Sequence, residues 1–175
     1  MVADWVLDVA NRQPATIDGA VRYELLDLAE FGLPLLDEEI PAAIGRYANP
    51  HTIAWAHAIE RFDGFVFVTP EYNHSMPAAL KNAIDYLFAE WSDKAAGFVS
   101  YGLHGGIRAV EHLRLALAET KVACVRGTVA LSLFADFEFP DITEPGTFTP
   151  GDRHEAVLVR MLGDALAPLR ARATA

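Results

Sequence analysis

The 175-residue sequence contains one cysteine, Cys124, and only 14 Lys and Arg against 24 Asp and Glu, which gives a formal net charge of −10. A single cysteine excludes internal disulfide bonds and is typical of a reducing compartment, so we expect a cytoplasmic protein. Such an acidic surface repels phosphate backbones and anionic lipids, which disfavours nucleic acid and membranes as partners.

Several other signals are missing from the sequence. No apolar run approaches the roughly 18 residues that a membrane helix needs, and Met1–Trp5 has neither the positive charge nor the cleavage site of a signal peptide. The six histidines form no H-E-x-x-H motif and no cysteine cluster exists, so no metal site is expected. The absence of G-x-S-x-G and G-x-G-x-x-G argues against a nucleophile elbow and a Rossmann dinucleotide fingerprint.

The chain does contain ample core material, since 52% of its residues are hydrophobic. Apolar runs without alternation predict strands that are buried on both faces, and helical spacing predicts helices between them. Val21–Ala29 alternates charged and apolar residues, and we expect a strand at or near a sheet edge there. The sequence therefore predicts one α/β domain over residues 1–175, with a doubly wound parallel sheet between helices.

The most informative stretch begins with the apolar strand Phe65–Val68 and continues through a polar turn into an amphipathic helix. Ser75 is expected to cap that helix, and Pro77 is expected in its first turn, where a missing N–H costs little. A turn at the carboxyl end of a parallel strand is where open α/β sheets bind ligands.

The string T-P-E-Y-N-H-S-M-P-A-A-L-K-N-A-I-D-Y-L, from Thr69 to Leu87, closely resembles the signature of the NADPH-dependent FMN reductase family. These are flavodoxin-like flavoproteins that include quinone, azo-dye and chromate reductases. The resemblance implies an FMN-containing oxidoreductase that takes hydride from NADPH or NADH and reduces a quinone-like or other small acceptor. It also implies a homodimer or homotetramer. Because the flavin carries the chemistry, no catalytic side chain is expected.

The resemblance also assigns cofactor contacts to two loops. In the first loop they are Pro70, Glu71, Tyr72 and Asn73, with Tyr72 as an aromatic wall and Asn73 as donor and acceptor; an ordinary strand-to-helix turn is the alternative. In the second loop they are Ser100, Tyr101, Gly102, Gly105 and Gly106. These glycines either let the ring approach and precede a helix N-terminus that favours negative charge, or simply serve a turn that needs positive φ.

The beginning of the chain departs from the family pattern. The family begins with a strand and a Ser/Thr/Arg-rich loop that holds the FMN phosphate, whereas this sequence begins inside what looks like the next helix. In the flavodoxin-like strand order 2-1-3-4-5 the first strand is central, so we expect that the native start lies upstream and that the first strand is missing. Two alternatives stay open: a flavin-free protein that acts as a non-enzymatic partner, and a flavodoxin-type electron carrier.

Three expectations concern the second half of the chain. The strand at 122–133 is expected to be irregular at Arg126–Gly127, and Cys124 within it is expected to be a buried structural thiol. Residues 135–151 are expected to form a long loop. Its phenylalanines either cover a substrate, pack on a neighbouring subunit or merely anchor the loop, and the sequence does not choose between these.

Overall fold

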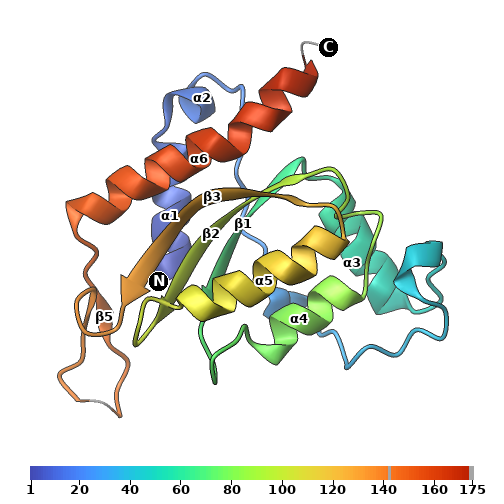
Figure 1. The fold of residues 1–175 in the computed structure, drawn as a ribbon, viewed down its shortest axis with the longest axis horizontal. Coiled ribbons are helices and arrows are strands. Elements are labelled where there is room, and N and C mark those ends of the chain that lie inside the picture. Colours follow the sequence, from blue (N-terminus) through green and yellow to red (C-terminus); the bar gives the residue numbers. More distant parts are fainter. Residues whose placement is uncertain (142, 174–175) are drawn as a thin grey trace.

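The computed structural model describes residues 1–141 and 143–173, and the side chains of these up to residue 167. Its centre is a parallel sheet with the strand order β1-β2-β3 (Figure 1). The strands are β1 (Gly64–Pro70), β2 (Ala95–Gly102) and β3 (Ala123–Ser132). The connections from β1 to β2 and from β2 to β3 each contain a helix, as parallel pairing requires. The expected α/β class is therefore confirmed.

Helices cover both faces of this sheet. Helices α1 and α6 share a core with one face, and α3, α4 and α5 share a core with the other (Figure 1). Their bounds are α1 Val2–Asn11, α3 Pro50–Glu60, α4 Ala78–Asp85, α5 Ile107–Glu119 and α6 Asp152–Ala173. Neighbouring residues of β2 point to opposite faces, since Phe98 belongs to the α3–α5 core and Val99 to the α1–α6 core. The result is three layers, αβα.

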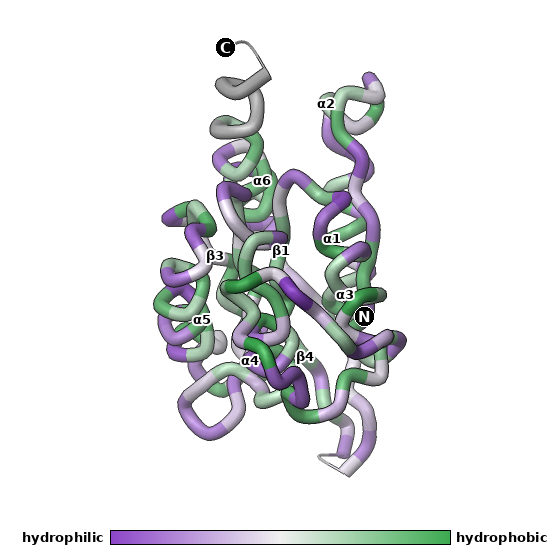
Figure 2. Tube along the Cα trace, turned by 90° about the vertical axis from the view of Figure 1, so that its right-hand side faces the viewer, coloured by the Kyte–Doolittle hydropathy of each residue, from purple (hydrophilic) through white to green (hydrophobic). Residues whose placement is uncertain are grey.

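Helix α5 is amphipathic, and hydrophobic and hydrophilic residues recur along it in Figure 2. Its buried side chains, at positions 109, 110, 113 and 117, lie at the helical spacing that the sequence shows. The short helical elements are α2 (Pro14–Ile17), η1 (Leu28–Phe31) and η2 (Ala42–Ile44). None of the helices in the described part of the chain combines the length and apolar character that crossing a membrane requires.

The strand expected at Val21–Ala29 was wrong, because residues 21–27 form no strand and η1 begins at Leu28. A strand needs a neighbour that pairs with its N–H and C=O groups. Among the described residues β1 pairs with β2 alone, so residues 21–27 form no ladder with the outer edge of β1. Tyr23 and Leu26 still pack against the two cores. The alternating pattern therefore marks a segment that packs on the layers without joining the sheet.

The irregularity expected at Arg126–Gly127 is confirmed, since the register between β2 and β3 shifts at this level. Met161 of α6 packs against the same point, and its sulfur accepts the N–H of Phe98 at 3.1 Å. A Cβ atom on Gly97 would lie 3.0 Å from the terminal methyl of Met161, so the close approach of α6 depends on this glycine.

The helical half of the signature motif holds the long segment 32–49 in place. Asn82 donates from Nδ2 to the carbonyl of Pro34 at 2.6 Å, and the buried Tyr86 donates its hydroxyl to Oδ1 of Asp37 at 3.0 Å. Burial, assisted by the hydrogen bond to Asp37, raises the pKa of Tyr86 to about 12. The phenol therefore remains a donor at neutral pH, and these two motif residues hold structure together.

Residues 135–151 were expected as a loop but contain a short antiparallel hairpin. Its strands are β4 (Phe137–Glu138) and β5 (Thr147–Phe148). The buried side chains of Asp136 and His154 join the hairpin base to α6, with 2.8 Å between Oδ1 and Nε2. The other carboxylate oxygen of Asp136 accepts the N–H of Ser132 at 2.7 Å. These contacts fix the hairpin at the end of β3.

Candidate functional site

The two loops singled out in the sequence lie side by side at the carboxyl edge of the sheet (Figure 1). Pro70 at the end of β1 is in register with Tyr101 of β2, and the N–H of Glu71 donates to the carbonyl of Tyr101 at 2.9 Å. Parallel strands bring their carboxyl ends to the same edge. The structure therefore brings together Pro70–Asn73 and Ser100–Gly106.

The first loop closes as a two-residue turn that the sequence did not reveal. Tyr72 and Ser75 exchange both backbone hydrogen bonds, at 2.9 and 3.0 Å, and the two residues between them have positive φ, 47° at Asn73 and 72° at His74. Positive φ at both central residues is the type I′ arrangement, which asparagine tolerates well. The turn holds Asn73 and the 63% exposed ring of Tyr72 out from the sheet.

Ser75 is not the helix cap that we expected. Helix α4 begins at Ala78, with Pro77 as its N-cap residue. The reason is that Ser75 belongs to the turn, where its backbone pairs with Tyr72, while its hydroxyl lies 2.9 Å from Nδ1 of His112 on α5. The serine therefore ties the turn to α5.

Glu71 also ties the first loop to α5. Its carboxylate accepts the N–H of Arg108 at 3.1 Å and the Arg108 guanidinium at 2.8 Å, and the side chain is only 12% exposed. Burial raises the pKa of Glu71, but the hydrogen bonds from Arg108 and from the N–H of Ala109 outweigh it and lower the pKa overall. The N–H groups at the start of α5, which we expected to face negative charge on a ligand, thus already hold a carboxylate.

The second loop is shaped by buried small residues. Ser100, fully buried, donates its hydroxyl to the carbonyl of Gly105 at 2.7 Å. Gly105 and Gly106 have φ of 75° and 69°, and a Cβ atom on Gly106 would lie 2.8 Å from the N atom of Tyr101. A Cβ on Gly102 would lie 3.2 Å from that of Glu71. The structure supports the turn interpretation of these glycines, because positive φ and close packing already require them.

Tyr101 begins a chain of aromatic rings that leads to the start of α1. Its ring lies 6.1 Å from that of Phe137, Phe137 lies 5.0 Å from Phe148, and Phe148 lies 5.5 Å from Trp5. Burial, with a smaller contribution from Tyr72, raises the pKa of Tyr101, so its phenol stays neutral. From the sequence, Trp5 is expected only to lie in the helix with which the chain begins. Nothing in its spacing shows that it lies at this edge of the sheet.

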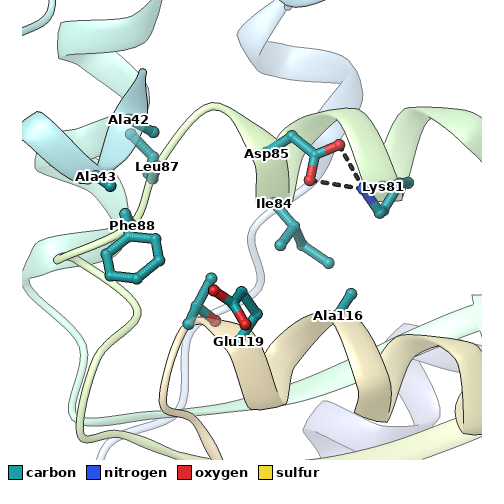
Figure 3. A pocket seen from close by; sticks show the side chains of 10 residues that line it. Ala42, Ala43, Lys81, Ile84, Asp85, Leu87, Phe88, Ala116 and Glu119 are labelled. Carbon is teal, nitrogen blue, oxygen red and sulfur yellow. Dashed lines mark hydrogen bonds and ion pairs between the residues drawn. The ribbon is translucent and has the colours of Figure 1, made fainter.

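A hollow lies between α4 and α5 beside the first loop. It has a volume of about 520 Å³ and opens between Ser75, Met76, His112 and Leu115. A further hollow of about 310 Å³ lies along the same two helices, toward η2 (Figure 3). Its wall includes Lys81, which forms an ion pair with Asp85. Lys81 and Ala116 line both hollows, and the two together are called the groove between α4 and α5 below.

The remaining candidates give no sign of metal or thiol chemistry. No group of three or more His, Cys, Asp or Glu residues in the described part of the chain is placed to hold a metal ion. Cys124 is only partly buried, and desolvation raises the pKa of its thiol. A raised pKa disfavours the thiolate, which is the nucleophilic form.

Comparison with known proteins identifies relatives of this arrangement. The family model described as NADPH-dependent FMN reductase matches residues 1–136. The NAD(P)H-dependent FMN reductase of Saccharomyces cerevisiae is 39% identical over 132 residues, which cover 72% of this chain and 69% of that protein. Its counterpart from Schizosaccharomyces pombe is 36% identical over 166 residues, with coverage of 93% and 79%.

The fold has relatives among solved structures. A flavoenzyme NAD(P)H:(acceptor) oxidoreductase from Paracoccus denitrificans superimposes with a TM-score of 0.68 and 19% identity, over 97% of this chain and 88% of that one. This likeness confirms the flavodoxin-like α/β fold. Together with the family match over more than half of the sequence, it leads to one conclusion: the chain belongs to the NADPH-dependent FMN reductase family.

Proposed function

We propose that this protein is an FMN-dependent oxidoreductase that uses NADPH or NADH to reduce a quinone-like acceptor, with the balance NAD(P)H + H⁺ + quinone → NAD(P)⁺ + hydroquinone. The observation that carries the proposal is the adjacency of the loops 70–73 and 100–106 at the carboxyl edge of the sheet. The names of the relatives, NAD(P)H-dependent FMN reductases and quinone reductases, support it.

The residues at this edge fit a flavin ring. FMN, when bound, supplies the redox chemistry, so the protein has to bind and orient it. The exposed ring of Tyr72 offers a flat apolar face, and Asn73 offers both a donor and an acceptor on a fixed turn. Pro70 and Tyr101 form the floor between the two strand ends. The start of α1 lies at the same edge (Figure 1), where helix N–H groups suit a phosphate.

The other assigned residues are proposed to shape the site. Glu71 holds the first loop against α5, and Ser100 holds the second loop closed. Gly102, Gly105 and Gly106 let the two loops pack against each other and against β3. In this assignment their replacement alters flavin binding by moving the loops.

The proposal is tested on purified protein, before and after incubation with FMN. We expect co-purifying or reconstituted FMN with flavin absorbance, and consumption of NADPH or NADH when a naphthoquinone is added. A protein that takes up no FMN would instead be the flavin-free partner. A protein with bound FMN that NAD(P)H does not reduce would be the electron carrier. Either result would contradict the proposed activity.

A homodimer or homotetramer is part of the proposal, with the groove between α4 and α5 as the contact surface. Support comes from Leu115, which is 74% exposed on this groove beside the apolar Met76 and Ala116. Light scattering of the Leu115→Glu variant should show dissociation, whereas Ile17→Glu, at a 72% exposed site on α2, should leave the mass unchanged. A cytoplasmic location also belongs to the proposal, supported by the single free cysteine.

A further inference from the structure

Three exposed apolar side chains, called the row below, lie at the carboxyl edge of the sheet, one on each of the three loops that follow its strands. Tyr72, Leu103 and Phe134 lie in the loops that follow β1, β2 and β3, and they are 63%, 58% and 80% exposed. The N–H of Glu71 donates to the carbonyl of Tyr101 at 2.9 Å, which joins the first loop to the second. The N–H of Leu133 donates to the carbonyl of Gly102 at 3.0 Å, which joins the second loop to the end of β3. The three loops therefore follow one another across the edge in strand order (Figure 1). Its first member belongs to the proposed flavin site, and the other two have no assigned role.

Phe134 is exposed on a fixed turn. Its N–H donates to Oγ of Ser132 at 3.3 Å, and the N–H groups of Ala135 and Asp136 donate to the carbonyl of Ser132 at 3.2 and 2.9 Å. The buried pair of Asp136 and His154 anchors this turn to α6. Because the turn is held from both sides, the exposed ring is presented in a defined place. Isolated exposed apolar residues are common, whereas exposed apolar side chains on three adjacent loops at one edge of a sheet indicate a contact surface.

The distribution of charged side chains around the row indicates which ligands can bind there. The chain has a net charge of −10, yet residues 72–77, 102–107 and 132–135 contain no Asp or Glu. The two flanking carboxylates, Glu71 and Asp136, are engaged in the hydrogen bonds described above. The loops that carry the row therefore have no free carboxylate of their own, which suits an apolar ligand that is neutral or anionic.

We propose that Leu103 and Phe134 form the contact surface for the electron acceptor and select planar, apolar acceptors that are neutral or anionic. The inference rests on the proposed function, because the row continues directly from the loop that is assigned to the flavin ring. A planar acceptor on these two side chains lies beside Tyr72, next to the proposed ring position.

The test uses FMN-loaded protein with Phe134→Ala, Leu103→Ala and the matched control Ile17→Ala, which removes an equally exposed side chain from α2. A naphthoquinone and its sulfonate are titrated into the oxidised protein, and Kd is read from tryptophan fluorescence. Because each substitution removes one ring or aliphatic contact, Phe134→Ala and Leu103→Ala should each raise the Kd of both naphthoquinones about three- to tenfold. The acceptor KM should rise equally, while flavin content, anaerobic reduction by NADPH and the KM for ferricyanide, which is not planar, stay unchanged.

Unchanged Kd and KM in both variants would overturn the inference. A changed oligomeric mass in Phe134→Ala would also overturn it, since the row would then be a contact between copies of the chain. Because the titration uses oxidised protein, it does not depend on turnover. Failure of NADPH to reduce the wild-type flavin therefore contradicts the proposed function separately.

Discussion

The contact between Glu71 and Arg108 holds the proposed flavin loop to α5, and Glu71→Gln measures its contribution. The substitution keeps the size of the side chain but removes the charge from a carboxylate that accepts two hydrogen bonds from Arg108. Hydrogen bonds to charged groups contribute about 1.5–3 kcal/mol. Because the Arg108 side chain is 40% exposed, solvent screening reduces this value. We expect a loss of about 1–2 kcal/mol in the free energy of unfolding at pH 7.

The pKa of Glu71 determines how the stability difference between wild type and Glu71→Gln changes with pH. The pKa of Glu71 is lower in the folded protein than its ordinary value of 4.5. A depressed carboxylate pKa stabilises the fold fully above the unfolded-state pKa, and the stabilisation is lost as the pH falls through the folded-state pKa. Urea unfolding of wild type and Glu71→Gln should therefore differ most near pH 7, and the difference should shrink below about pH 4.5.

Two results would refute this reasoning about Glu71. One is a stability difference that does not change between pH 7 and the acidic range. The other is a loss no larger than that of the control Glu24→Gln, whose carboxylate pairs with Arg61 on the surface. The same variant should bind FMN more weakly, because the Tyr72–Asn73 turn follows Glu71 directly.

Three further predictions concern the loops and the sheet. Asn73→Ala and Asn73→Gly should both lower FMN retention, measured by flavin absorbance after dialysis. Glycine tolerates the positive φ of this position, so wild-type retention in Asn73→Gly would contradict a role for the amide. Gly106→Ala should lower the free energy of unfolding by about 1–3 kcal/mol, because the added Cβ atom meets the backbone of Tyr101. The control Gly163→Ala lies in open space on α6, and in urea unfolding it should be neutral or stabilising. Equal effects of the two substitutions would refute the packing argument. Amide hydrogen exchange should be faster in β1 than in β2, because among the described residues β1 pairs on one side only, with β2, whereas β2 pairs on both sides. Equal protection of the two strands would show that the outer edge of β1 is covered.

The sheet and its helices could be predicted from the sequence because their patterns are local. Phe65–Val68 has no alternation, which predicts a strand covered on both faces, and the spacing on α5 predicts its buried stripe. The strand prediction for Val21–Ala29 was wrong because a strand depends on more than its local pattern. An alternating pattern is compatible with a strand, but a strand also needs a pairing partner, and only the three-dimensional arrangement shows whether one exists.

The candidate site was predictable in its position and less so in its details. The signature motif located the first loop and the family resemblance located the second, yet neither showed that the Glu71 carboxylate contacts Arg108, 37 residues away. The turn at Asn73-His74 was missed because its sequence is not the Asn-Gly that marks type I′ turns most clearly. Phe134 was missed because its exposure depends on the hydrogen bonds of its turn.

The central claim is that the loops after β1 and β2 hold a flavin that NADPH reduces. The most direct measurement is an anaerobic titration of FMN-reconstituted protein with NADPH, followed by the flavin absorbance, with naphthoquinone added at the end. The account predicts that the flavin band bleaches as NADPH is added and returns when the quinone is supplied. A flavin band that stays oxidised in excess NADPH and NADH, or protein that retains no FMN, would contradict it.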